Sequence, residues 1–425
     1  MTVTGPCNAL DVVDVVALGE SMVTFLPTRP GRLADVPSFD RAIGGAESNV
    51  ACGLAAAGHA VRWVSRVGAD GFGDHLVEAI REYGVDVSAV RRDPVRPTGV
   101  YFRTAGDRAT DAHEVAYYRA GSAASAMSAA NVDLVAVRAG RMLHLSGITA
   151  ALSDDCLALM HDLVARRPDG GPLVSFDVNH RPGLWRNTDG PDVLLDLARA
   201  CDIVFVGTDE AEAAWGITGG PEAIRALLPE PGVLVVKDGA RGATAFERAA
   251  MPGQCGHGSE AASGRSPARQ PDLTPGGQSG HGPADAVTAR AQPFRSAAGA
   301  PGPEQDGTPA APAGAPRIRP ATSESTATFV PALHVDVVAA VGAGDAFAAG
   351  FLSGTLRGLG VRERVRHGHL MAAAALTVSG DLAAPPSRDH ADRLVTLDDV
   401  EWEKLRLGPG WTQATERAVE EVRTP

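Results

Sequence analysis

The sequence predicts an α/β protein that is built on a largely parallel sheet and carries a second, smaller β unit. Three observations support this prediction. Short β-branched runs alternate with helical segments along much of the 425 residues. Polar residues follow where several of these runs end, and parallel sheets place their ligands at that edge. Near the start of the chain, short strand candidates separated by Pro and Gly interrupt the alternation, which indicates a separate hairpin-like unit.

Length and composition narrow the class of protein. The chain is long enough for two to three domains, and its net charge of -12 argues against non-specific nucleic-acid binding while leaving small anionic ligands open. No apolar run approaches the roughly 20 residues of a membrane span, and the N-terminus lacks the pattern of a signal peptide. The cysteines are odd in number and show no paired spacing, which predicts reduced thiols in a cytoplasm. They are Cys7, Cys52, Cys156, Cys201 and Cys255.

The first strand is expected over residues 12–18, and it ends at Gly19-Glu20, where a site would face it. Strand candidates at 22–26 and 36–43 form the smaller unit. Two glycines then precede a helical segment whose first turn carries Asn49. An amide there has the donor and acceptor that sugar hydroxyls need, but it is equally an ordinary polar residue near a helix start.

Two more short strands, at 98–103 and 114–119, follow an α/β unit that begins with a strand at 61–67. Because strand side chains alternate, Tyr117 and Arg119 project from one face. An aromatic ring and a guanidinium on one face suit a carboxylate or hydroxyls, whereas the alternative is an exposed β surface.

Four buried strands come next, and each is followed by polar or glycine-rich residues. They are expected at residues 142–145, 173–176, 203–206 and 233–236. Arg181 follows the second of them and suits bidentate binding of a carboxylate. Glu210 follows the third, in an acidic helix start that satisfies the helix dipole without further function, although it also suits a magnesium-bound water. Lys237 begins a glycine turn after the fourth.

Composition changes abruptly over residues 249–325, which are rich in Gly, Pro, Ala and Ser and poor in aliphatic residues. Such a segment buries too little apolar surface to offset its ordering entropy, so a disordered insertion is expected. The strand-like sequence pattern stops at Phe246 and resumes near Ala327, which places the insertion in a hairpin turn. Residues 1–11 and 406–425 are expected to be tails, and a helix over 371–378 and an amphipathic piece over 391–401 complete the chain.

The most informative stretch is Gly342-Ala343-Gly344-Asp345. It follows an apolar run at 333–340 that reads as a strand, and it opens a segment with helical spacing. A glycine turn at a helix N-terminus can wrap an anion, because the first N–H groups lack intrahelical partners and the dipole is positive. Asp345 beside such an anion hole suits a base that takes a proton from a hydroxyl attacking phosphate. The alternative is a glycine turn with Asp as helix cap.

The chain resembles the PfkB, or ribokinase-like, carbohydrate kinase family, and within it the ketodeoxygluconate kinases. The matching blocks run in family order across nearly the whole chain outside the insertion and the tails. Several of them are weak signals alone, but together they are specific for the family. They are residues 44–51 (GGAESNVA), 65–74 (SRVGADGFGD), 98–101 (TGVY), 117–122 (YYRAGS), 143–149 (LHLSGIT), 177–181 (DVNHR) and 342–350 (GAGDAFAAG).

The resemblance implies a ribokinase-like three-layer α/β/α sandwich with a small β-sheet lid. The kinase domain would comprise residues 12–248 and 326–405, with 22–43 and 96–121 forming the lid. The implied reaction transfers the γ-phosphoryl group of ATP, with Mg²⁺, to the 6-hydroxyl of 2-keto-3-deoxygluconate. Family likeness also implies a homodimer through the lid. Nucleic-acid and membrane partners are not expected, because of the net charge and the lack of a long apolar run.

Residue roles follow from the same resemblance. Asp345 would be the general base, and the amides of Gly342, Ala343 and Gly344 would form the anion hole. The sugar would be bound by Gly45, Ala46, Asn49, Tyr101, Tyr117, Arg119, Arg181 and Asp381. The nucleotide side would comprise Asn179, Lys237, Gly239, Gly242 and Gly344, with Glu210 helping to hold magnesium.

Two positions depart from the family pattern. Ala339-Ala340 stand where the last motif usually has an Asp followed by Thr or Pro, and Gly207 replaces the Asn of N-x-x-E. The first change removes a carboxylate near the anion hole and the second a polar group near magnesium. Two alternatives therefore stay open: a PfkB kinase for a neutral sugar such as fructose or ribose, and a module that binds sugar or nucleotide without turnover. A nicotinamide oxidoreductase is disfavoured, because no G-x-G-x-x-G opens an N-terminal βαβ unit.

Overall fold

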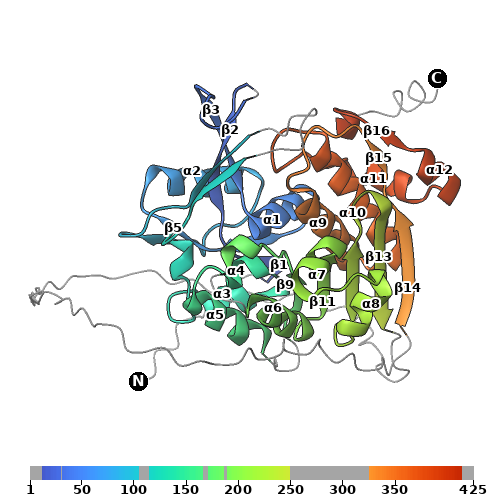
Figure 1. Cartoon of the computed structure of the whole chain (residues 1–425), viewed down its shortest axis with the longest axis horizontal. Helices are drawn as coiled ribbons and strands as arrows, with labels where there is room; N and C mark the ends of the chain where they lie inside the picture. Colours follow the sequence, from blue (N-terminus) through green and yellow to red (C-terminus); the bar gives the residue numbers. More distant parts are fainter. Residues whose placement is uncertain are drawn as a thin grey trace, which may run out of the picture. The chain divides into compact units, whose positions relative to one another are not determined.

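The computed structural model describes residues 12–29, 31–104, 114–165, 171–185, 189–248 and 325–413. Its centre is an eight-stranded sheet (Figure 1). Neighbours are parallel from β12 to β4, and β13 and β14 add an antiparallel edge. In spatial order the strands are β14 (Ser325–Pro331), β13 (Gly242–Arg248), β12 (Val233–Lys237), β11 (Ile203–Gly207), β10 (Leu173–Asp177), β9 (Gly140–Ser146), β1 (Val13–Leu18) and β4 (Val61–Val64).

Helices cover both faces of this sheet, so the three-layer α/β/α sandwich is confirmed. Alternate residues of β1 serve the two layers, since Val15 and Ala17 belong to one core and Val16 and Leu18 to the other. The first core is shared with α1 (Ala46–Ala56), α2 (Gly71–Glu82), α9 (Ala343–Leu356), α10 (Val361–Leu376), α11 (Arg388–Val395) and α12 (Asp399–Lys404). The second face carries α3 (Leu134–Arg138), α4 (Gly147–Ala150), α5 (Asp154–Val164), α6 (Gly190–Arg199), α7 (Thr208–Trp215) and α8 (Gly220–Leu227).

A separate four-stranded sheet forms the lid (Figure 1). Its spatial order is β3 (Phe39–Gly44), β2 (Met22–Pro27), β7 (Val100–Arg103) and β8 (Val115–Tyr118). On one face Tyr101 and Arg103 are buried, and on the other the rings of Phe25 and Phe102 stack with centroids 4.6 Å apart. The smaller unit expected from the early Pro and Gly spacing is thus present. The expected homodimer through it stays a prediction.

Short elements complete the described chain. Arg66–Gly68 (β5) pairs with Arg91–Asp93 (β6), so the run read as one strand over 61–67 is divided between two sheets. The 3-10 turns are η1 (Ala124–Ala126), η2 (Pro182–Leu184), η3 (Gly239–Arg241) and η4 (Trp411–Gln413).

Three expectations about the C-terminal part were wrong. The strand read over 333–340 is reduced to β15 (His334–Val335), because the following residues run as a half-exposed loop to α9. The amphipathic piece over 391–401 is two helices, since Asp398 caps a new helix by accepting from the N–H of Glu401. Residues 406–413 are not a tail: β16 (Arg406–Leu407) pairs with β15, and Trp411 is buried.

The chain leaves and re-enters the main sheet on neighbouring strands. Arg248 at the end of β13 lies opposite Ser325 at the start of β14, an antiparallel pairing that agrees with the expected hairpin. The predicted insertion itself lies outside the described residues, as do the expected tails at 1–11 and 414–425. None of the helices in the described ranges is long and apolar enough to span a membrane.

Candidate active site

The N-terminus of α9 forms a tight glycine turn, as the sequence predicts. Gly342 has φ of +78°, a conformation that favours glycine. A Cβ atom on Gly342 would lie 2.2 Å from the carbonyl oxygen of Asp381, so neighbouring backbone also excludes any side chain. Ala343, Gly344 and Asp345 follow in the first helical turn, where free N–H groups and the positive helix end suit an anion.

Asp345 is held by a residue from the other end of the chain. The Nδ2 of Asn49, in the first turns of α1, donates a hydrogen bond of 2.8 Å to Oδ2 of Asp345. Burial raises the pKa of Asp345 to about 8; the Asn49 hydrogen bond opposes the rise, Asp177 adds to it, Lys237 opposes it and Asp381 adds to it. Two residues predicted for base and sugar binding are therefore in direct contact.

Lys237 lies at the C-terminal end of β12, next to this turn. Its Nζ is 2.9 Å from Oδ2 of Asp177 at the end of β10. A Cβ on Gly344 would be 3.5 Å from the same Nζ, so the ammonium lies beside the glycine turn. Burial alone would lower the pKa of Lys237, but Asp177 and Glu210 raise it, so the side chain is a fixed cation. A cation here is suited to transferred phosphate oxygens.

Glu210, in the first turn of α7, is the carboxylate expected near magnesium. Its Oε2 accepts from the N–H of Gly207 at 2.8 Å, and its Oε1 lies 3.4 Å from Nη1 of Arg181. Burial raises the pKa of Glu210, with Lys237 opposing the rise and Asp177 adding to it. The guanidinium of Arg181 is about half exposed and points to this acid, so no contact joins it to Asn49 or Asp345.

These acids fit a magnesium ion that arrives with a nucleotide. The carboxylates of Asp177 and Glu210 both lie close enough to Lys237 to raise its pKa, so two acids are gathered at this edge of the sheet. Across the described ranges no group of three or more His, Cys, Asp or Glu side chains forms a metal cage. Magnesium in phosphoryl-transfer sites is usually held by one or two carboxylates together with phosphates and water, and Asp177 and Glu210 would supply the carboxylates of such a set.

The other residues predicted for the nucleotide side share special backbone geometry. Asn179 has φ of +40°, and its buried Oδ1 has no hydrogen-bond partner in the structure. Gly239, the first residue of η3, and Gly242, which follows η3, have φ of +52° and +140°. A Cβ on Gly242 would be 2.3 Å from the carbonyl oxygen of Val330, so the turn after Lys237 needs glycine there.

The lid supplies aromatic and cationic side chains to the opposite side of the site. The hydroxyl of Tyr101 donates to Oδ2 of Asp381 at 2.8 Å, and the rings of Tyr101 and Tyr117 lie 5.4 Å apart. The guanidinium of Arg119 lies 5.8 Å from the ring centre of Tyr117, which confirms that the two share a face. Arg119 is also ion-paired with the buried carboxylate of Glu20.

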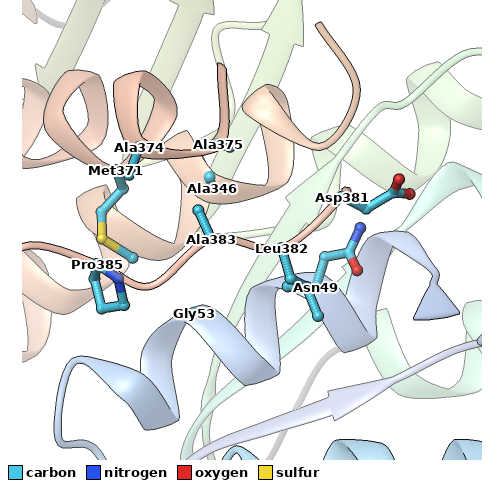
Figure 2. Close-up of a pocket in the computed structure, with 10 residues that line it drawn as sticks. All are labelled: Asn49, Gly53, Ala346, Met371, Ala374, Ala375, Asp381, Leu382, Ala383 and Pro385. Atoms are coloured by element: carbon cyan, nitrogen blue, oxygen red, sulfur yellow. The ribbon is translucent and has the colours of Figure 1, made fainter. Parts of the chain in front are cut away.

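A small cavity lies between α1, α9, α10 and the segment that follows α10 (Figure 2). Asn49 and Asp381 lie at one end of it, and Met371 and Pro385 at the other. Its volume is about 20 Å³, room for little more than a water molecule. Gly45 and Ala46 lie at the start of α1, where a Cβ on Gly45 would be 2.4 Å from the carbonyl oxygen of Glu20.

Sequence reasoning assigned no role to several residues that make these contacts. Glu20 and Asp177 each end a predicted strand, and their position at the C-terminal edge of the sheet was the available signal. Arg103 stands two residues after Tyr101 on one strand, so alternation places both on the same face. Glu47 is buried, and its Oε1 accepts from the hydroxyls of Ser146 and Thr149; nothing local in the sequence indicates this.

A doubly wound sheet, a β lid and a carboxylate beside a glycine-rich helix start define a phosphotransferase that acts on a small molecule. Residues 13–260 and 321–388 match the family described as pfkB family carbohydrate kinase, and the chain belongs to that family.

Individual relatives agree with this assignment. The chain is 29% identical to the 2-dehydro-3-deoxygluconokinase of Bacillus subtilis (strain 168), over 89% of this chain and 94% of that protein. It is 34% identical to the protein of the same name from Thermoproteus tenax, over 57% of this chain and 73% of that one. Fructokinase-1 of Oryza sativa subsp. japonica is 30% identical over 55% of this chain and 73% of that protein.

Solved structures show the same fold. The PfkB protein from Polaromonas sp. JS666 superimposes with a TM-score of 0.64 at 29% identity, covering 89% of this chain and 99% of that one. A sugar kinase from Pyrococcus horikoshii in complex with ATP superimposes with a TM-score of 0.62 at 19% identity, covering 88% and 96%. The protein is thus a carbohydrate kinase.

Proposed function

We propose that the protein phosphorylates the 6-hydroxyl of 2-keto-3-deoxygluconate with ATP. The chemistry is supported by Asp345, held by Asn49 at the glycine turn. The substrate is supported by the long match to relatives named 2-dehydro-3-deoxygluconokinase and by Arg119, a largely buried cation on the lid. A guanidinium suits the carboxylate that distinguishes this substrate from neutral sugars.

In the proposed reaction Asp345 takes the proton of the sugar hydroxyl as that oxygen attacks the γ-phosphorus of ATP, while the bond from that phosphorus to the bridging oxygen breaks and ADP leaves. The N–H groups at Gly342, Ala343 and Gly344, with Lys237 beside them, stabilise the charge that develops on the phosphoryl oxygens. Magnesium, when bound with the nucleotide, would neutralise phosphate charge, and Glu210 and Asp177 are the residues that would hold it. The raised pKa of Asp345 makes its carboxylate a stronger base than an ordinary aspartate.

Sugar recognition falls to residues from both the lid and the body. Asn49 lies beside the attacking hydroxyl through its contact with Asp345, and Tyr101 and Asp381 lie together at the same end of the cavity. Gly45 and Ala46 supply close backbone, while Tyr117 and Arg119 close the site from the lid. Arg181 joins them only if it leaves Glu210 when substrate binds.

Nucleotide binding is proposed along the C-terminal ends of β10 to β12. Asn179, with its unpaired buried oxygen, and Lys237 are the polar contributors there. Gly239, Gly242 and Gly344 let the phosphates and the base approach backbone closely.

Two observations support a second candidate function, a kinase that acts on a neutral sugar. Relatives named fructokinase match more than half of the chain, and the ion pair with Glu20 partly neutralises Arg119, so a neutral sugar is the alternative substrate.

The third candidate function is a module that binds sugar or nucleotide without turnover, because Ala339, Ala340 and Gly207 lack the polar side chains of the family pattern. The double variant Ala339→Asp with Gly207→Asn tests this candidate. If the wild type turns over rapidly and the double variant has the same rate, these three residues give no reason to propose a module without turnover.

The deciding experiment is coupled ADP release by the purified chain with magnesium-ATP. Four acceptors are compared, 2-keto-3-deoxygluconate, gluconate, fructose and ribose, for wild type and Asp345→Asn. Turnover confined to the keto acid and lost in the variant supports the proposal. Turnover on fructose or ribose keeps the kinase and replaces the substrate, and turnover that survives in Asp345→Asn removes its role as base.

A further inference from the structure

Arg103 links the lid to the body through a buried ion pair. From β7, its Nη2 donates to Oδ1 of Asp381 at 2.8 Å and to the carbonyl oxygen of Ser379 at 2.9 Å. Both charged side chains are about 5% exposed, and 278 residues separate them in the sequence. The contact therefore depends entirely on how the lid sheet meets the segment after α10.

Such a pair is an unpromising source of stability. Removing two charges from water costs several kcal/mol per ion, and the attraction between them commonly does little more than offset this cost. A buried guanidinium that fixes one carboxylate does, however, restrict where that carboxylate can lie. The position of Asp381 is therefore what the pair determines.

Asp381 in turn contacts the turn where the phosphate is expected. Its Oδ2 accepts from Tyr101, so the lid holds both carboxylate oxygens. Its carbonyl oxygen lies against the α-carbon of Gly342, at the place where a Cβ would come within 2.2 Å. Gly44 of β3 lies against the carboxylate of Asp381, since a Cβ on Gly44 would be 2.6 Å from Oδ2. Lid, sugar side and glycine turn converge on this residue.

We propose that Arg103 is a positioning residue for phosphoryl transfer: it fixes Asp381, and through the backbone of Asp381 it holds the Gly342–Gly344 turn in place. The proposal rests on the proposed function for the reaction that the turn serves. It adds that the lid, besides covering the sugar, braces the anion hole. Arg103 itself touches neither the reacting hydroxyl nor the phosphate, and acts through Asp381.

The test compares Arg103→Met and Arg103→Lys in the full chain, with Arg62→Met as a matched control. The buried guanidinium of Arg62 also forms an ion pair, with the partly exposed carboxylate of Asp86 at 2.7 Å, but Arg62 lies on β4 of the main sheet and not in the lid. For Arg103→Met we expect kcat to fall by about 100-fold, the effect of a misplaced catalytic group, with KM for ATP within about threefold of wild type. Lys restores part of kcat, because an ammonium reaches one carboxylate oxygen but lacks the fork geometry.

A second measurement does not need turnover. Amide hydrogen exchange of residues 342–347 should accelerate by about tenfold or more in Arg103→Met, and not in Arg62→Met, because local opening of the turn becomes easier. Unchanged exchange and kcat in Arg103→Met, or equal changes in the Arg62 control, would overturn the proposal. If Arg103→Met does not fold, Arg103→Lys and Asp381→Asn carry the same two measurements, with unchanged values in both counting against it. Failure of wild type to phosphorylate any acceptor would sink the proposed function alone, since exchange still decides the role of Arg103.

Discussion

The carboxamide of Asn49 and the carboxylate of Asp345 are joined by a hydrogen bond of 2.8 Å across 296 residues of sequence. It links the first turns of α1 and α9, the helices proposed to bind the sugar and the phosphate. The amide stabilises the ionised form of an acid whose pKa is already raised to about 8. Asn49 therefore orients this carboxylate and lowers its pKa, and in the proposed reaction it would set the pH at which Asp345 acts as base.

Replacing Asn49 by Ala should raise the pKa of Asp345 further, because a donor to the carboxylate is lost. The general base must be ionised, so the rising limb of kcat/KM against pH should move to higher pH by about one unit. Asn131→Ala is the control, since its amide donates to the carbonyl oxygen of Ala126, and that variant should leave the limb in place. If the midpoint of the rising limb is unchanged in Asn49→Ala, the hydrogen bond does not affect the ionisation on which activity depends.

Replacing Asp345 by Asn should remove activity and add stability. Loss of a general base costs about 10²- to 10⁴-fold in kcat. The pKa of Asp345 is raised from 3.8 to about 8 in the folded state, so its contribution to stability is full below pH 3.8 and is lost as pH rises through 8. The gain in the free energy of unfolding for the Asn variant should therefore grow between pH 4 and 8 and stay level above.

Urea unfolding of both proteins at pH 5, 7 and 9 measures this gain. We expect the variant to be more stable by about 1–3 kcal/mol at pH 9, a typical cost of an imperfectly compensated buried group. A variant that is less stable than wild type at pH 9 would contradict the burial argument, whatever its activity.

Local patterns predicted most of the fold because each strand and helix is encoded by its own residues. The β-branched runs became β1, β9, β10, β11 and β12, and the glycine turn before Asp345 became the N-terminus of α9. The run at 333–340 was misread because Val337 and Val338 are apolar yet lie 45% and 42% exposed in a loop. Apolar residues in a short run do not distinguish a strand from a loop that approaches a site.

The site was predicted less completely, for a different reason. Asn49 and Asp345 lie in recognisable glycine-rich blocks, whereas the partners of Asp381 and Arg119 are distant residues, Arg103 and Glu20. No spacing rule joins residues 278 positions apart, so these pairs emerge only when the lid sheet and the main sheet are placed together. Arg181 shows the same limit, because its partner Glu210 comes from the next strand–helix unit.

Replacing Lys237 by Met should destabilise the protein and shift its pH profile. In the wild type, Oδ2 of Asp177 lies 2.9 Å from the ammonium of Lys237. The variant leaves Asp177 without this partner, and breaking a buried pair in this way costs about 3–5 kcal/mol. Lys237 also lowers the pKa of Asp345, so its loss should move the rising limb of kcat/KM to higher pH. The double variant Lys237→Met with Asp177→Asn should recover part of the stability but none of the activity. A double variant no more stable than Lys237→Met would show that the pair is not what holds this edge of the sheet.

Replacing Gly342 by Ala should cost far more than its backbone conformation alone explains. Gly342 and Gly358, at the two ends of α9, have φ of +78° and +71°. Each Ala substitution therefore carries a similar penalty for the left-handed conformation, about 1–2 kcal/mol. A Cβ on Gly358 meets nothing within 4 Å, whereas one on Gly342 would lie 2.2 Å from the carbonyl oxygen of Asp381.

The difference between the two variants isolates the contact with Asp381. We expect Gly358→Ala to lose only the conformational penalty and to keep its kcat. Gly342→Ala should lose more stability and about 100-fold or more in kcat, because the turn must move away from the phosphate to admit the methyl group. Urea unfolding and ADP release measure the two effects side by side. Equal losses in both variants would mean that the segment at Asp381 yields freely, and that the turn keeps its place without that support.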